Sequence, residues 1–168
     1  MSDNPTSVDA EGVFEPFHIG RVPWEEFSRG ERFGMRFQHL SSFGGGTQIG
    51  VAMEILAPGK QANQAHYHLL EEEHVFVLDG HMTLRLGDKV FELSADHYVC
   101  FPAGQPVAHS LFNHTNAPCR YLVLGNPQPH DVAVFPETGR VSVKLVGEGY
   151  RKAATMAYWD DVDVGPRD

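Results

Sequence analysis

Four side chains in two separate segments have the types and the spacing of metal ligands. In the segment AHYHLLEEEHVFVLDG, residues 65–80, His66 and His68 stand two residues apart and Glu73 follows them. In an extended chain, residues i and i+2 point to the same face and lie roughly 7 Å apart at Cα, so both imidazoles can reach one ion. Two polar residues on an exposed strand face have the same spacing, so the histidine pair alone leaves both interpretations open.

The carboxylate and a third histidine point toward one interior. Glu73 begins an apolar run in which the residues of the same parity are Val75 and Val77, so its face is expected to lie inside the protein. A charge is not usually buried there without a partner or a metal. Further along, His109 shares its parity with the apolar Leu111, so it can enter the same interior from another strand.

The elements that must position these side chains read as β-strands. Short apolar runs recur between turn residues, which is typical of an antiparallel sandwich or barrel. The predicted strands are residues 48–56, 73–79, 81–86, 89–93, 97–101, 109–113 and 120–125, with two further candidates at 132–135 and 141–146. For the N-terminal part we expect a short helix followed by an added strand.

Length and composition fit a single domain. The chain has 168 residues, of which 42% are hydrophobic and 21% are charged, as in ordinary globular proteins. We divide it into an N-terminal arm (1–46) that packs on the barrel, a barrel (47–126) and a C-terminal extension (127–168). The sequence contains no internal repeat, so a second domain is not expected.

Charge and apolar content narrow the range of partners and compartments. A net charge of −9 argues against a nucleic-acid partner, which needs clustered Lys and Arg. The uninterrupted apolar runs are far shorter than the roughly 20 residues of a spanning helix, so no membrane partner is expected. The first twenty residues lack the features of a secretory signal. Together with two cysteines, Cys100 and Cys119, expected to be free thiols, this predicts a cytoplasmic location.

Two segments resemble the conserved motifs of the cupin superfamily. PGKQANQAHYHLLEEEHVFVLDG resembles the first motif through Gly59, His66, His68, Glu73 and Gly80, and DHYVCFPAGQPVAHSLFN resembles the second through Pro102, Gly104, His109 and Asn113. The six residues between Glu73 and Gly80 select Glu73 over Glu71 and Glu72 as the ligand. The chain departs from the pattern at Asp96, where a glycine usually stands before the proline, and in a longer loop before His109.

The resemblance implies both the fold and the metal. The fold is an all-β, cupin-type double-stranded β-helix, or jelly-roll barrel, with an N-terminal arm and a C-terminal tail. The resemblance also implies one divalent ion per chain, bound by His66, His68, Glu73 and His109. Three imidazoles and one carboxylate without a thiolate suit Fe, Mn, Ni, Co or Zn. The whole chain is similar to small, stand-alone bacterial cupins.

Two classes of function remain open for such a protein. In the first, the ion serves an enzyme that acts on a small oxygenated metabolite, since cupins include oxygenases, isomerases, decarboxylases and lyases. Tyr98 and Tyr121 are then the strand-borne candidates for proton transfer. The predicted strands carry only three basic residues, Arg85, Lys89 and Arg120, which argues against a phosphate-bearing substrate. In the second class the chain is a non-catalytic binding or sensor protein for a small-molecule ligand.

We also expect a homodimer. The strand HVFVLDG is apolar on both parities, which is consistent with a second buried face, and the N-terminal arm is expected to help to cover an edge strand. The remaining histidines lack ligand-type spacing or the right parity and are expected to stay away from the site; they are His18, His39, His74, His81, His97, His114 and His130.

Overall fold

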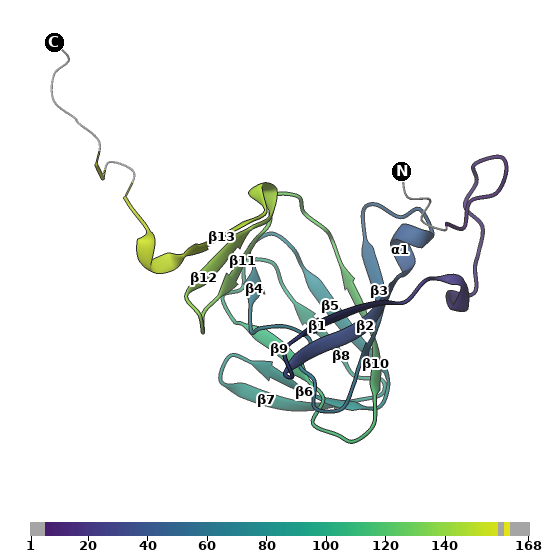
Figure 1. Ribbon diagram of the computed structural model, residues 1–168, viewed down its shortest axis with the longest axis horizontal. Coiled ribbons are helices and arrows are strands. Elements are labelled where there is room, and N and C mark those ends of the chain that lie inside the picture. The colour runs from purple at the N-terminus through teal and green to yellow at the C-terminus, as the bar shows by residue number, and fades with distance from the viewer. Residues whose placement is uncertain (1–5, 158–159, 162–168) are drawn as a thin grey trace, which may run out of the picture.

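Antiparallel strands form nearly all of the regular structure in the computed structural model of the chain (Figure 1), which describes residues 6–157 and 160–161. The strands curl around one interior, and a hairpin near the C-terminus extends from one end of this barrel. The predicted all-β jelly-roll class is confirmed. No helix among the described residues is long and apolar enough to cross a membrane.

The largest sheet has six strands, in the order β1-β2-β3-β10-β5-β8. Every neighbouring pair in it is antiparallel. Its strands are β1 (Glu25–Arg29), β2 (Phe33–His39), β3 (Gly50–Leu56), β10 (Cys119–Gly125), β5 (Glu73–Asp79) and β8 (Tyr98–Phe101).

Two smaller sheets complete the fold. The first has the order β7-β6-β9 and consists of β7 (Lys89–Ser94), β6 (His81–Leu86) and β9 (His109–Phe112). The second has the order β13-β12-β11-β4 and consists of β13 (Glu148–Arg151), β12 (Arg140–Val143), β11 (Val132–Phe135) and β4 (Tyr67–His68). A one-turn helix, α1 (Leu40–Phe43), and three 3-10 turns, Ile19–Arg21, Lys144–Val146 and Lys152–Ala154, connect the strands.

The apolar core lies between the six-stranded sheet and the β7-β6-β9 sheet. Val75 and Val77 on β5 are almost fully buried, and Met82 and Leu84 on β6 face them. The side chains between these positions on each strand point outward, which is the period-two alternation of a strand with one buried face. The same parity carries Glu73 into the interior.

The predicted strands of the barrel coincide with β3, β5, β6, β7, β8, β9 and β10 to within two residues at each end. In the N-terminal part, the short 3-10 turn Ile19–Arg21 precedes two strands, β1 and β2, and α1 follows them, so the expected helix is a single 3-10 turn and the expected added strand is a pair of strands. β2 pairs with β3 from Arg36↔Ile55 to His39↔Ala52, so these tertiary contacts override the weak local pattern. The segment thus adds two strands to the barrel's own sheet.

Two tight turns hold the ends of the central strands. Gly80, between β5 and β6, has a φ of +84°, and a Cβ there would lie 2.7 Å from the carbonyl oxygen of Pro118. Only glycine fits such a position without displacing the backbone. Asp96, at the position where the cupin motif usually has glycine, has a φ of +68° and donates its N–H to the Val77 carbonyl. The left-handed turn therefore forms with aspartate in place of the usual glycine, since aspartate tolerates this conformation.

Candidate metal centre

The two histidine-bearing segments are hydrogen-bonded directly to each other. The His109 N–H donates to the His66 carbonyl at 2.9 Å, and the His66 N–H donates to the His109 carbonyl at 3.2 Å. Such a pair places the two side chains on one face of the ladder. His68 follows two residues later on β4, and its ring centroid lies 4.9 Å from that of His66. The predicted same-face placement of the two histidines is thus present in the structure.

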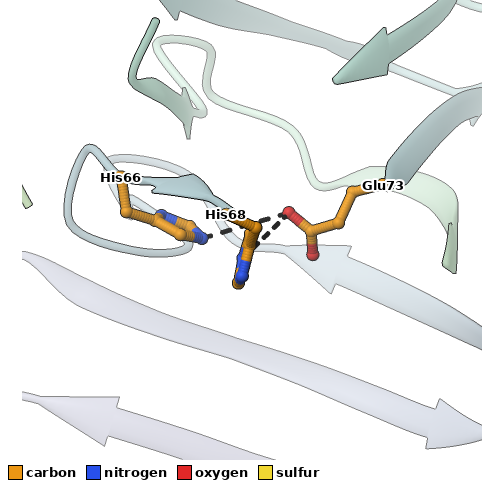
Figure 2. Close-up of side chains that lie close together, drawn as sticks. All are labelled: His66, His68 and Glu73. Carbon is orange, nitrogen blue, oxygen red and sulfur yellow. Dashed lines mark ion pairs between the residues drawn. The ribbon is translucent and has the colours of Figure 1, made fainter. Parts of the chain in front are cut away.

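All three imidazoles converge on one oxygen of Glu73. Glu73 Oε2 lies 3.1 Å from Nε2 of His109, 3.5 Å from Nε2 of His68 and 4.0 Å from Nε2 of His66. Figure 2 shows His66, His68 and Glu73 pointing toward one another, and their ligand atoms all lie within 4.8 Å of one another. His109 extends this group through its contact with Glu73.

These residues fit a divalent ion by spacing and by protonation state. Two atoms about 2.1 Å from one ion lie about 3 Å apart when the angle at the ion is near 90°. Burial, and then the charge of His109, lower the pKa of His66 to about 4, so its ring is neutral at pH 7, as a ligand must be. Burial alone would raise the pKa of Glu73, but the contacts with His109 and His68 hold it below its ordinary value. Glu73 is therefore an anionic candidate ligand.

Outer contacts fix the orientation of each imidazole. His68 Nδ1 lies 2.6 Å from Asp131 Oδ2, and His66 Nδ1 lies 2.8 Å from the carbonyl oxygen of Gln64. A ring that donates from Nδ1 presents the lone pair of Nε2, which is the nitrogen that faces Glu73. The His109 ring stacks on Phe101 with their centroids 3.8 Å apart.

Asp131 is a functional residue that the sequence analysis missed. Its carboxylate is almost fully buried and also accepts the N–H groups of Leu70 and Glu71. Burial raises its pKa, but the hydrogen bonds from His68 and Leu70 outweigh that effect and keep the carboxyl ionised. Asp131 lies 63 residues after His68, in the C-terminal extension, and no local motif marks it.

The three consecutive glutamates have three different positions. Glu73 points at the imidazoles, whereas Glu72 lies 3.1 Å from Nε2 of His74 on the outer face of the sheet. Glu71 accepts the Gln128 N–H at 2.6 Å and pairs with Lys144. Its other oxygen lies 3.7 Å from Nδ1 of His68, on the side of the ring away from Glu73. The geometry thus agrees with the choice of Glu73.

The two predicted tyrosines have different locations, and neither lines the cavity of the imidazoles. Tyr98 is 60% exposed on the outer face, where its hydroxyl lies 2.6 Å from Nδ1 of His74. The structure therefore does not bring Tyr98 to the metal ligands. The parity of β8 explains this, because Phe101 points inward and Tyr98, three residues away, must point outward. Tyr121 is fully buried and pairs in register with Glu54.

Glu54 is the second residue that the sequence analysis missed. It lies on β3 and lines a cavity of about 60 Å³ together with His66, Glu73 and His109. Burial raises its pKa to about 7; the neighbouring Tyr121 hydroxyl partly offsets this rise, and the charge of Glu73 adds to it. Burial, followed by the charge of Glu54, raises the pKa of Tyr121 far above its ordinary value. A carboxyl that titrates near pH 7 beside a metal site can both accept and donate a proton.

The strand topology, together with the inward-facing cluster of histidines and Glu73, indicates a small β-barrel protein with a candidate metal site. Residues 52–125 match the family model described as "Cupin domain". Residues 52–125 thus form a cupin domain, and the resemblance of the two motifs to the cupin family is confirmed.

Known proteins similar to this chain come from several bacteria. The sugar phosphate isomerase from Silicibacter pomeroyi is 24% identical, with a TM-score of 0.74 over 85% of this chain and 96% of that one. A protein from Acidithiobacillus ferrooxidans, also described as a sugar phosphate isomerase, is 24% identical, with a TM-score of 0.76 over 89% of this chain and 94% of that one. These likenesses show the fold.

One relative is known from its sequence. The tetracenomycin polyketide synthase protein TcmJ from Streptomyces glaucescens is 28% identical over 91 residues, which are 54% of this chain. The match spans 56% of TcmJ, so it covers little more than half of that protein.

The ligand assignment predicts which variants lose metal. Glu73→Ala and His66→Ala should bind the ion at least roughly 100-fold more weakly, because each removes a ligand, and Asp131→Asn should cost about 10–100-fold because it frees the His68 ring. The measurement is elemental analysis of protein purified without a tag or chelator, followed by titration with the ion found.

Two neighbouring glutamates provide matched controls for that experiment. Glu71→Ala and Glu72→Ala remove the same group from the same segment, and both should retain the metal content of the wild type. Equal metal content in purified Glu73→Ala and Glu71→Ala proteins would reject the assignment.

Proposed function

We propose that the chain is a metal-dependent enzyme that acts on a small oxygenated metabolite. One divalent ion, Fe, Mn, Ni, Co or Zn, is held by His66, His68, Glu73 and His109. The observation that carries the proposal is the convergence of three imidazoles on Glu73 in a cavity that Glu54 also lines. A structural ion would need no second ionisable carboxyl beside it, whereas proton transfer does.

The residues around the ion support proton-transfer chemistry. A bound ion supplies Lewis acidity toward an oxygen of the substrate. Glu54 lines the same cavity, and burial raises its pKa in the protein without an ion, so it is placed to take a proton from the substrate and return it at another atom. Tyr121 is fully buried and is the register partner of Glu54 on the neighbouring strand, so it is a candidate positioning residue rather than a catalytic one. Among oxygenase, isomerase, decarboxylase and lyase reactions, these features favour the isomerase and lyase types.

The similar proteins support the same choice. Both solved structures reported above are described as sugar phosphate isomerases, and their alignments cover 85% and 89% of this chain, which is more than the cupin domain alone. The polyketide synthase protein TcmJ matches over a shorter part. An isomerase-type reaction on an oxygen-rich substrate is therefore the form of the proposal that we favour.

Water bound to the ion tests the proposal against the non-catalytic alternative. The protein would be stripped with a chelator and reloaded with Mn²⁺, and the longitudinal relaxation of water protons would be measured. Four protein ligands on an octahedral ion leave two positions for exchangeable water, so a clear relaxation enhancement is expected. His66→Ala, with its weaker site, is the control for unbound Mn²⁺.

A bound ion that shows no exchangeable water would have no open position for a substrate. That result would contradict the enzyme and leave a sensor or carrier of a small ligand.

The raised pKa of Glu54 predicts a pH dependence of stability in the chelator-treated protein. The unfolded chain loses this proton near the ordinary pKa of 4.5, whereas the folded chain keeps it until about pH 7. Between these values Glu54 binds more protons in the folded state than in the unfolded state, so its contribution to the free energy of unfolding falls as the pH rises. His66, with its lowered pKa, contributes the opposite slope below about pH 6.5. Glu54→Gln removes this effect and should gain about 1–3 kcal/mol relative to wild type between pH 4.5 and pH 8.

Urea unfolding at several pH values measures this gain. Glu72→Gln, an outward-facing glutamate, is the control and should differ from wild type by a constant amount. A constant difference for Glu54→Gln as well would show that Glu54 has no raised pKa.

We further propose that the protein is a cytoplasmic homodimer. The outer face of β5 and β10 supports the dimer because Phe76, Leu78, Leu122 and Leu124 are only partly buried there within one chain. The free thiols of Cys100 and Cys119 suit a reducing compartment. Light scattering at micromolar concentration should give twice the chain mass of 18.7 kDa; the mass of one chain would contradict the dimer.

A further inference from the structure

A pocket of about 290 Å³ opens beside the metal ligands, and His66 and His68 line it. Asn63 and Gln64 of the cupin domain also line it, and its remaining walls come from the two end segments of the chain. The β1–β2 hairpin provides one wall and the β11–β12 hairpin provides the opposite one; the side chains concerned are Phe27, Arg29, Phe33, Phe135 and Arg140.

The charge of this pocket is opposite to that of the protein. The chain carries a net charge of −9, yet among the residues that the structure describes, two arginines and no acidic side chain line the pocket. Within the described part of the chain, neither Arg29 nor Arg140 has a carboxylate oxygen within 4.0 Å, whereas Arg85 and Lys144 both have acidic partners. The guanidinium groups of the pocket are thus free to bind an anion.

Arg140 shares an aromatic neighbour with a candidate ligand. Its guanidinium carbon lies 4.3 Å from the centroid of the Phe135 ring, and the His66 ring stacks on the same ring with the centroids 5.6 Å apart. Phe135 therefore contacts both the guanidinium and a candidate metal ligand. Arg140 is also the register partner of Arg151 on β13. Like charges directly opposite each other on paired strands are destabilising, and a bound anion would relieve that repulsion.

We propose that this pocket binds the anionic group of the substrate, a phosphate or a carboxylate, through Arg29 and Arg140. The inference rests on the proposed function, since it places the rest of the substrate at His66 and His68. Both arginines offer planar donor pairs that match either anion. The sequence analysis argued against a phosphate because it counted only the predicted strands, and Arg29 and Arg140 lie outside that count.

The test uses small anions that do not depend on the identity of the substrate. The full chain, loaded with metal, would be titrated with inorganic phosphate and separately with acetate by calorimetry at constant ionic strength. Arg29→Gln and Arg140→Gln should each weaken the binding of the preferred anion by roughly tenfold or more, because each removes charged hydrogen bonds. Arg120→Gln, the same change on an exposed position of β10, should bind like wild type.

The results separate the two anions and decide the proposal. Tighter binding of phosphate identifies a phosphorylated substrate, and tighter binding of acetate identifies a carboxylate. Binding that is equal in wild type and both pocket variants would overturn the proposal, and so would the absence of binding of either anion at tens of millimolar.

Parallel measurements keep this inference separate from the metal assignment. Arg29→Gln and Arg140→Gln should keep the wild-type metal content, because neither residue is a ligand. Repeating the titrations on chelator-treated protein shows whether the arginines bind an anion without the ion. If no metal is found in any preparation, the proposed function fails, but the loss of anion binding in the two variants still decides the anion pocket.

Discussion

A carboxylate inside an apolar barrel has to be compensated, and much of the structure follows from this requirement at Glu73. Its strand continues with Val75 and Val77, which are almost fully buried in the core, so the register that buries them also turns the half-buried Glu73 carboxylate inward. Imidazoles from β9 and from the segment around β4 supply the compensation. They can do so because the His66 and His109 backbones are hydrogen-bonded to each other. The fold and the site are consequences of the same strand pairing.

The segments outside the cupin domain complete the site. Asp131 reaches His68 from the C-terminal extension, and β11 pairs with β4 through Ala133↔His68 and Val134↔Tyr67. On the same side, Lys144 pairs with Glu71. These contacts tie the extension to the segment that carries two of the candidate ligands, so its removal would free the His68 ring. The sequence can be divided into a barrel and a C-terminal extension, but the candidate site is built from residues of both.

Parity accounts for what the sequence could predict about the site. His66, His68, Glu73 and His109 were placed on one interior because each has an apolar neighbour of the same parity or a partner two residues away, and such local patterns survive folding. Asp131 and Arg140 depend on contacts between distant segments, and no local pattern encodes these. The sequence did not show that Tyr98 points outward, because the direction of its side chain follows from that of Phe101, and the sequence alone did not show that Phe101 points inward. Glu54 was overlooked because a single glutamate in an apolar strand gives no sign of its pKa.

The charges around the candidate ion connect the separate observations. A divalent ion would be balanced by Glu73 directly and by Asp131 through the His68 ring, while His66 is neutral. In the protein without an ion, burial raises the pKa of Glu54 to about 7, so near neutral pH this carboxyl adds only part of a negative charge, and its ionised form can accept a proton. Arg29 and Arg140 line the neighbouring pocket and have no acidic partners among the described residues. The ion, its ligands and these two arginines together would therefore carry an excess of positive charge. An anionic substrate would neutralise that excess, and its arrival would make it easier for Glu54 to keep a proton taken from the substrate, because added negative charge raises a carboxyl pKa. Anion binding by Arg29 and Arg140 and proton transfer at Glu54 would thereby be coupled electrostatically, without any movement of the barrel.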